Sequence, residues 1–157
     1  NVPSRTGLHL TADTLGRIAR HEKIVGIKEA SGDPALAADM MHACPEDFAF
    51  YSGEDANIVV LRALGAKGVI SVLSNIAPRA VSDMMTLPFD RAAKIQIAYM
   101  PLIRLLFCET NPIPVKAALA KMGLCRNELR LPLVPMSAGS AELLYDEMLR
   151  LGIVCQS

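Results

Sequence analysis

Short apolar runs alternate with amphipathic helical patterns along the first half of the chain. The runs expected to form strands are residues 24–28, 48–52 and 68–72. Helical patterns are expected over residues 11–21, 33–44 and 55–64. Strand and helix in regular alternation predict βα crossovers and a parallel sheet. Three strands, preceded by what resembles the end of another in residues 1–7, are too few to close a barrel. The sheet is therefore expected to be open, or to be half of a larger one.

The pattern changes after Asn75, because only helices are predicted from there on. Pro78 is expected to begin the first of them, and Pro101 is expected to bend the long helix over residues 90–109. Two further helices are predicted over residues 111–122 and 140–151, with a proline-rich connector at 131–135. This part of the chain therefore reads as a helical appendage.

Lys28 ends the first complete predicted strand. Side chains alternate along a strand, so Lys28 is expected on one face, while Val25 and Ile27 pack against helices on the other. A lysine enclosed by apolar neighbours loses solvation of its ammonium form, which makes available the free amine that attacks a ketone. The chemistry expected of Lys28 is Schiff-base formation; the alternative is a solvated surface lysine.

Composition excludes several classes of function. The chain is 52% hydrophobic and has 16 basic and 16 acidic residues, so neither a nucleic-acid nor a membrane partner is expected. No apolar run is long enough to span a membrane, which favours a cytoplasmic protein. The four cysteines, Cys44, Cys108, Cys125 and Cys155, show no paired spacing. We expect reduced, mostly buried thiols and no metal site.

Several separated segments then agree in order and spacing with one known family. They are the segment Asn-Val-Pro-Ser-Arg-Thr-Gly at residues 1–7, Lys28, and the segments at 52–53, 68–71, 111–116 and 129–132. Together they resemble the pyruvate-dependent aldolase family of dihydrodipicolinate synthase and N-acetylneuraminate lyase, over the whole chain. The resemblance implies an α/β fold: the C-terminal half of a TIM (β/α)8 barrel in residues 1–88, followed by a three-helix C-terminal domain in residues 89–157.

The resemblance also implies a reaction and its residues. Lys28 would condense with the keto group of pyruvate, and the resulting enamine would attack the aldehyde of L-aspartate 4-semialdehyde, on the route to lysine and diaminopimelate. Arg5 would hold the carboxylate of that second substrate, since a guanidinium matches a carboxylate with two parallel hydrogen bonds. Gly53 would line the pocket, and main-chain atoms of Ile70 would lie beside pyruvate. No cofactor is expected.

Other interpretations stay open. Arg5 could form an ordinary loop ion pair, and Gly53 and Ile70 could be plain barrel core. The resemblance places a tyrosine just before Asn1, and the pyruvate-binding threonines and the lysine-feedback site in a missing N-terminal half, so this chain alone is expected to be inactive. It could belong to another aldolase branch, such as N-acetylneuraminate lyase or a keto-deoxy sugar acid aldolase. It could also be an inert half-barrel that pairs with its missing half or with a copy of itself. The family commonly forms homotetramers.

Overall fold

The computed structural model describes residues 1–153, which fall into two compact units. The first unit is Asn1–Ser71, and the second begins at Val72. The units divide between Ser71 and Val72, whereas the predicted boundary between barrel and helical domain follows residue 88. The predicted boundary stays a prediction, because the compact units are defined by contacts and not by the βα repeat of a barrel.

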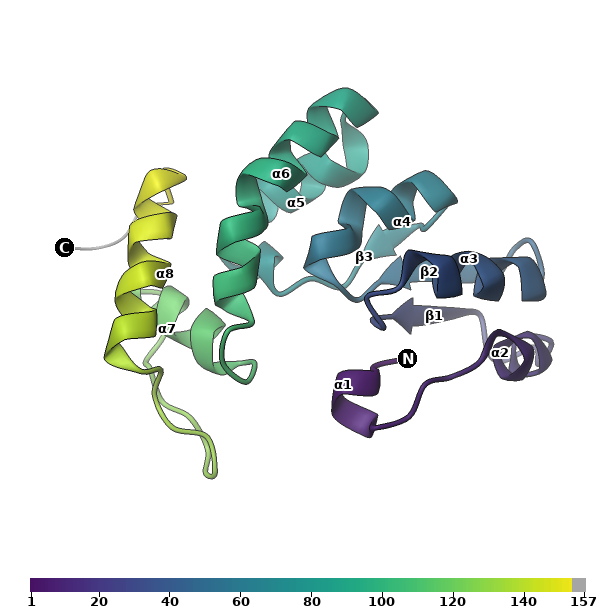
Figure 1. Cartoon of the computed structure of the whole chain (residues 1–157), viewed down its shortest axis with the longest axis horizontal. Coiled ribbons are helices and arrows are strands. Elements are labelled where there is room, and N and C mark those ends of the chain that lie inside the picture. Colours follow the sequence, from purple (N-terminus) through teal and green to yellow (C-terminus); the bar gives the residue numbers. More distant parts are fainter. Residues whose placement is uncertain (154–157) are drawn as a thin grey trace. The chain divides into compact units, whose positions relative to one another are not determined.

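The first unit is built of βα repeats, as the pattern predicts. Its strands β1 (Gly26–Glu29), β2 (Ala49–Ser52) and β3 (Gly68–Val69) pair in parallel in the order β1-β2-β3 (Figure 1). Its helical elements are α1 (Pro3–Thr6), α2 (Ala12–Ile18), α3 (Pro34–Ala43), the 3-10 turn η1 (Asp55–Asn57) and α4 (Ile58–Leu64). The predicted parallel sheet is therefore confirmed, with shorter strands than expected.

Residues before α2 add to this sheet. The Asn1 amino group donates to the Lys28 carbonyl (2.9 Å), and the Ala30 amide donates to the Asn1 carbonyl (2.8 Å). Two such bonds, to residues on either side of one partner, are the pattern of parallel pairing. Asn1 thus bonds to β1 in the manner of a parallel neighbour, and α1 follows it where a loop was expected. That residues 1–7 begin at the end of a strand stays a prediction.

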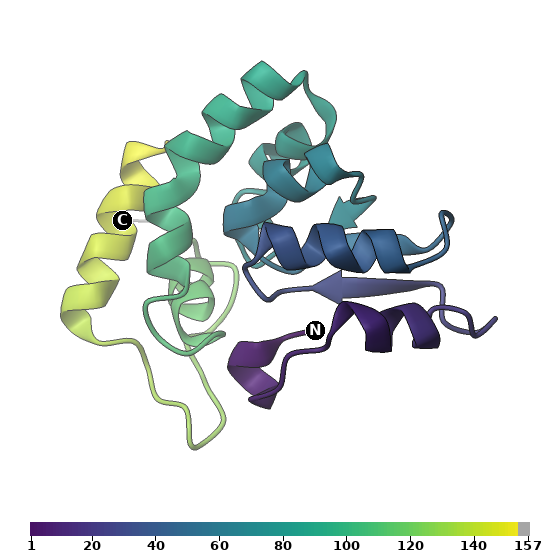
Figure 2. The ribbon, with the colours of Figure 1, turned by 45° about the vertical axis from the view of Figure 1, so that its right-hand side comes forward.

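Helices cover one face of the sheet only. Ile27 and Phe50 alternate onto that face and are buried in a core with Leu15, Met40 and Leu61. Figure 2 shows α3 running alongside β1. The opposite face of the three strands carries no such layer among the residues of the first unit.

Val25 departs from its prediction. It was expected to pack against helices with Ile27, but 75% of its surface is exposed. The strand begins at Gly26, so Val25 lies in the segment before the strand.

The predicted helix starts are confirmed by their caps. Thr11 Oγ1 accepts a hydrogen bond from the Thr14 amide (3.2 Å), and Asp33 Oδ1 accepts from the Ala35 and Leu36 amides (2.9 and 3.2 Å). These bonds satisfy amides that have no partner inside the helix. Gly65 ends α4 with φ 109°, a conformation that favours glycine.

Gly26 is required by the close approach of β1 and β2. A Cβ atom on Gly26 would lie 2.5 Å from the Ala49 carbonyl oxygen, a backbone atom that cannot turn aside. We expect Gly26→Ala to lower the free energy of unfolding by about 1–3 kcal/mol, as overpacking does. Denaturant titration followed by circular dichroism measures this.

Gly139→Ala is the matched control, because its added methyl group meets no atom within 4 Å. That variant should be unchanged or slightly more stable. Equal unfolding midpoints for Gly26→Ala and the unaltered chain would contradict the steric account.

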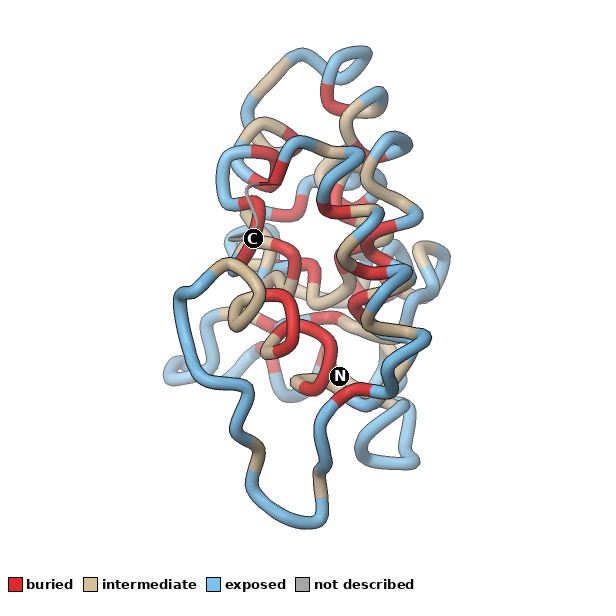
Figure 3. Tube along the Cα trace, turned by 90° about the vertical axis from the view of Figure 1, so that its left-hand side faces the viewer, coloured by how far each residue is buried: buried red, intermediate tan, exposed pale blue. Residues whose placement is uncertain are grey.

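The second unit is helical. It contains the 3-10 turn η2 (Leu73–Asn75) and the helices α5 (Pro78–Thr86), α6 (Phe89–Leu106), α7 (Ile113–Lys121) and α8 (Ala138–Arg150). Helix α6 packs against each of the other three helices. The side chains of Met84, Leu102, Leu106, Leu144 and Met148 are completely buried between them, and Figure 3 shows the buried stretches along the trace. No strand occurs in residues 72–153, so the prediction of helices alone after Asn75 is confirmed for the described residues, while the strand expected at 68–72 ends at Val69.

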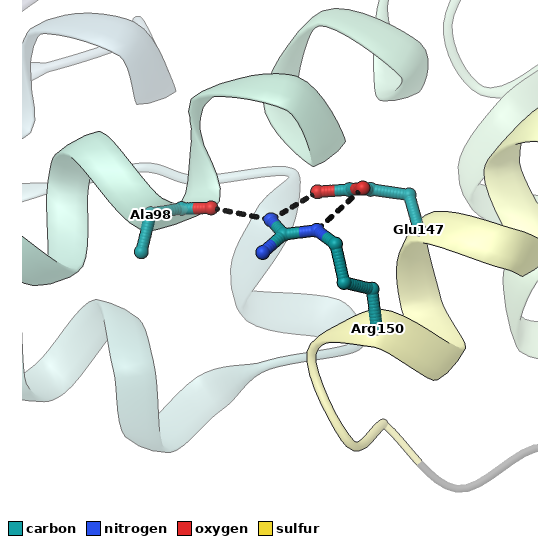
Figure 4. A network of polar contacts seen from close by, with 3 residues as sticks. All are labelled: Ala98, Glu147 and Arg150. Atoms are coloured by element: carbon teal, nitrogen blue, oxygen red, sulfur yellow. Dashed lines mark hydrogen bonds and ion pairs between the residues drawn. The ribbon is translucent and has the colours of Figure 1, made fainter.

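One side chain ties α8 to α6. Arg150 Nη2 donates to the Ala98 carbonyl (2.9 Å), while Arg150 Nε donates to Glu147 Oε2 (2.8 Å) (Figure 4). A second bond from Nη2 to Glu147 makes the pair bidentate. Ala98 lies in the turn before Pro101, where a proline ring crowds helix carbonyls. Arg150 thus holds the C-terminal turn of α8 against the α6 backbone.

Glu109 stabilises the other end of α8. Its carboxylate accepts hydrogen bonds from Ser137 Oγ (2.7 Å) and the Ser137 amide (3.1 Å), at the N-cap of α8. These bonds lower the pKa of Glu109 from its ordinary value of 4.5. A carboxyl group with a lowered folded-state pKa stabilises the fold above its unfolded pKa, and the effect is lost as pH falls through the folded pKa.

Glu109→Gln tests this contact. We expect the unaltered chain to have the higher melting temperature at pH 7 and the difference to disappear at pH values well below 4.5. Thermal melts across that range measure it. A difference that is the same at all pH values would show that the Glu109 charge is not involved.

The cysteine prediction is partly wrong. Cys108 and Cys125 are exposed, because they lie just beyond the ends of α6 and α7, and Cys44 is half-buried. All three are free thiols, and burial raises the pKa of Cys44. Cys155 lies outside the described residues. No helix within residues 1–153 has the length and apolarity needed to cross a membrane.

Candidate active site

The predicted site residues gather at one edge of the sheet. Arg5 lies in α1, which follows Asn1; Gly53 directly follows β2 and Ile70 directly follows β3. Lys28 lies in β1, next to its last residue. Parallel strands all end at the same edge, and α1 lies beside the arrowhead of β1 (Figures 1 and 2). The site is therefore assembled from four separate segments of the first unit.

Lys28 lies on the face opposite the helices. In the register of the sheet it is the partner of Tyr51, which in turn is the partner of Gly68, so these three residues share a face. Lys28 is exposed, so the expectation that apolar neighbours enclose it is wrong for this chain. The reason is that three strands form an open sheet, so no layer of the first unit covers the face opposite the helices, which we call the inner face.

Gly53 and Ile70 are held by backbone hydrogen bonds to the neighbouring strands. The Gly53 amide donates to the Glu29 carbonyl (2.7 Å), and the Ile70 amide donates to the Ser52 carbonyl (2.8 Å). Half of the Ile70 surface is exposed, so its side chain is not barrel core in this chain. Arg5 is also exposed.

Glu29 is a buried charged residue that sequence reasoning missed. It is 1% exposed, and its Oε1 accepts hydrogen bonds from Asn1 Nδ2 and the Ser31 amide, both at 2.9 Å. Asn1 Oδ1 in turn accepts from the Leu10 amide (3.0 Å). Glu29 therefore anchors the start of the segment that carries Arg5. The signal was a second charged residue directly after Lys28 in a strand whose neighbours are apolar.

Glu54 adds a carboxyl group at the same edge. Burial raises the pKa of Glu54, and the nearby charges of Asp55 and Glu29 raise it further, against a lowering hydrogen bond from the Ala56 amide. Glu54 is the N-cap residue of η1, directly before Asp55. Glu54 therefore takes up a proton more readily than an ordinary glutamate, beside the residues expected to bind substrate.

A pocket of about 330 Å³ lies away from this edge. It is lined by Arg20, His21, Val25, Asp47 and Phe48, near the starts of β1 and β2. No chemistry was predicted there. Nor do three or more His, Cys, Asp or Glu side chains come together to hold a metal ion within residues 1–153. The predicted site is thus an open surface in this chain.

Comparison with known proteins decides the family. The model of the dihydrodipicolinate synthetase family matches residues 1–148. The chain belongs to this family. A curated relative, the 4-hydroxy-tetrahydrodipicolinate synthase of Alkaliphilus oremlandii, is 44% identical over 158 residues, which cover 98% of this chain and 54% of the relative. The chain spans about half the length of the curated relatives it matches.

Solved structures of this family show the same fold. Dihydrodipicolinate synthase from Aquifex aeolicus superposes with a TM-score of 0.95 at 36% identity, covering 100% of this chain and 55% of that one. The chloride-inhibited synthase from Acinetobacter baumannii, complexed with pyruvate, gives 0.94 at 41% identity, with 98% and 54% covered. The predicted fold class is confirmed: the chain has the fold of the C-terminal half of a TIM-barrel synthase with its C-terminal helical domain.

Proposed function

We propose that this chain carries the Schiff-base half of a synthase that condenses pyruvate with L-aspartate 4-semialdehyde to 4-hydroxy-tetrahydrodipicolinate. The observation that carries the proposal is the place of Lys28, on the inner face at the carboxyl edge of parallel strands, in a chain of this family. Barrel enzymes assemble their active sites at that edge.

Each residue at the edge has a proposed part in the reaction. The Lys28 amine adds to the keto carbon of pyruvate and water leaves, which gives an imine. Loss of a proton from the pyruvate methyl group gives an enamine, whose carbon attacks the aldehyde of the second substrate. Arg5 binds the carboxylate of that substrate. Gly53 and the main chain of Ile70 border the bound pyruvate.

Completion of the site requires more chain than is present here. The hydroxyl groups expected to relay protons, and the threonines expected to bind the pyruvate carboxylate, belong to the other half of the barrel. We therefore expect imine formation to be slow and turnover absent in this chain alone. The homotetramer expected for the family stays a prediction.

Borohydride reduction in the presence of pyruvate tests the proposal. The expected result is one reduced pyruvate adduct, located on Lys28 by peptide mass spectrometry. The reaction is run on this chain and on a chimera in which it replaces the matching half of the Alkaliphilus oremlandii synthase. An adduct in the chimera alone would show that the other half is needed, and no adduct in either would reject the proposal.

A second candidate function follows from the open face. Ile70 and Tyr51 are 50% and 38% exposed on the side of the sheet that helices do not cover. Such a face favours association, so this chain could act only as an assembling half-barrel. Sedimentation of the chain with the N-terminal half of the relative distinguishes the two: assembly without any adduct would support this candidate.

A further inference from the structure

The aliphatic stem of Lys28 lies directly against the backbone of Gly53. A Cβ atom on Gly53 would be 2.8 Å from Lys28 Cε and 2.9 Å from Lys28 Cγ. Carbon atoms at their best separation are about 3.5–4.0 Å apart. The lysine stem thus occupies the space that any side chain at residue 53 would fill.

The backbone on either side of this contact is fixed. The Gly53 amide is bonded to the Glu29 carbonyl at 2.7 Å, and the Ala30 amide to the Asn1 carbonyl at 2.8 Å. Ala30 Cβ would lie 2.7 Å from a Cβ on Gly53. Gly53 is not among the residues with positive φ, so its backbone conformation is open to alanine. An alanine there would be strained only by its contacts, and the movable neighbour is the Lys28 side chain.

The same arrangement occurs one strand further along the sheet. A Cβ atom on Gly68 would lie 3.2 Å from Tyr51 Cδ1 and 3.3 Å from Tyr51 Cε1. Each long side chain on the inner face therefore leans over a glycine of the next strand: Lys28 of β1 over the residue that follows β2, and Tyr51 of β2 over Gly68 of β3.

We propose that Gly53 is a positioning residue for Lys28. Because Gly53 has no side chain, the methylene groups of Lys28 pack against its backbone, and this contact sets the direction of the Lys28 amine. The proposal rests on the proposed function of Lys28. A lysine side chain has four rotatable bonds. If its conformation is fixed before pyruvate binds, less conformational entropy is lost when the imine forms. This role is distinct from lining the substrate pocket.

Nuclear magnetic resonance on the 157-residue chain tests the contact itself. Nuclear Overhauser effects are expected from the Gly53 α-protons to the γ- and ε-methylene protons of Lys28. Gly53→Ala should remove them and shift the Lys28 methylene resonances. Their absence in the unaltered chain would overturn the proposal, whatever the chemistry of Lys28.

Adduct formation tests the consequence. In the chimera, Gly53→Ala is expected to slow formation of the reduced pyruvate adduct on Lys28 by roughly ten- to a hundredfold, the scale of a displacement of about 1 Å. The melting temperature reports any loss of folding. Gly139→Ala is the matched control, since its methyl group meets no atom within 4 Å, and its adduct rate should be unchanged.

Removal of the Ala30 methyl group separates positioning from crowding of the backbone. Ala30→Gly alone should form the adduct at the unaltered rate. Gly53→Ala with Ala30→Gly should remain slow, because the clash with Lys28 persists; recovery of the rate would overturn the proposal. If the unaltered chimera forms no adduct, the proposed function fails instead, and the Overhauser contacts alone decide whether Gly53 holds Lys28.

Discussion

Lys28→Arg is expected to reduce the borohydride-trapped pyruvate adduct to background and to abolish synthase activity in the chimera. Arginine keeps a positive charge on a long stem, but its guanidinium stays protonated and has no free amine to add to a ketone. Because Lys28 is exposed and lies near the end of β1, the exchange removes no buried contact of the core. The loss should therefore be chemical, with the melting temperature unchanged.

Lys23→Arg is the control for this experiment. Lys23 is also exposed and lies shortly before β1, so both variants make the same exchange in the same part of the chain. Peptide mapping after reduction should find the adduct in Lys23→Arg and none in Lys28→Arg. An adduct that persists in Lys28→Arg would place the imine on another lysine and remove the basis of the proposed function.

Arg5→Ala is expected to weaken use of L-aspartate 4-semialdehyde while leaving the pyruvate adduct intact. A hydrogen bond to a charged group contributes about 1.5–3 kcal/mol, so kcat/KM for the aldehyde should fall about ten- to a hundredfold. Arg5→Lys should recover part of the loss, because it restores the charge without the planar fork. Steady-state rates in the chimera and the trapping reaction measure the two effects separately.

The same pair of measurements separates the branches of the family. The aldolases that act on sugar acids are not expected to use an arginine at this position, so a selective loss supports the synthase assignment. Equal loss of aldehyde use and of the pyruvate adduct would contradict it. It would instead make Arg5 a contact of α1 that affects the whole edge of the sheet.

The sequence predicts local structure well where one residue decides it. Thr11 and Asp33 begin their helices by bonds within one turn, and Gly65 ends α4 by its own backbone conformation. The parallel pairing of the strands follows from the alternation of strands and helices. Such features depend on neighbours in the chain, which periodicity reports directly.

Predictions that depend on distant segments were less reliable. The exposure of Lys28 depends on how many strands surround it, and that of Val25 on where β1 begins. The contact between Gly53 and the lysine stem depends on the pairing register of two strands. No periodicity within one segment contains that information.

The contacts of Asn1 bear on the substrate-binding role that we propose for Arg5. Its side chain bonds to Glu29 on one side and to the Leu10 amide on the other, so the first ten residues form a loop that is closed at its base. A guanidinium on a tethered loop loses less conformational entropy when it binds a carboxylate. In the proposed reaction, the conformational entropy of this arm would be lost when the chain folds, so more of the attraction between the Arg5 guanidinium and a substrate carboxylate would contribute to binding.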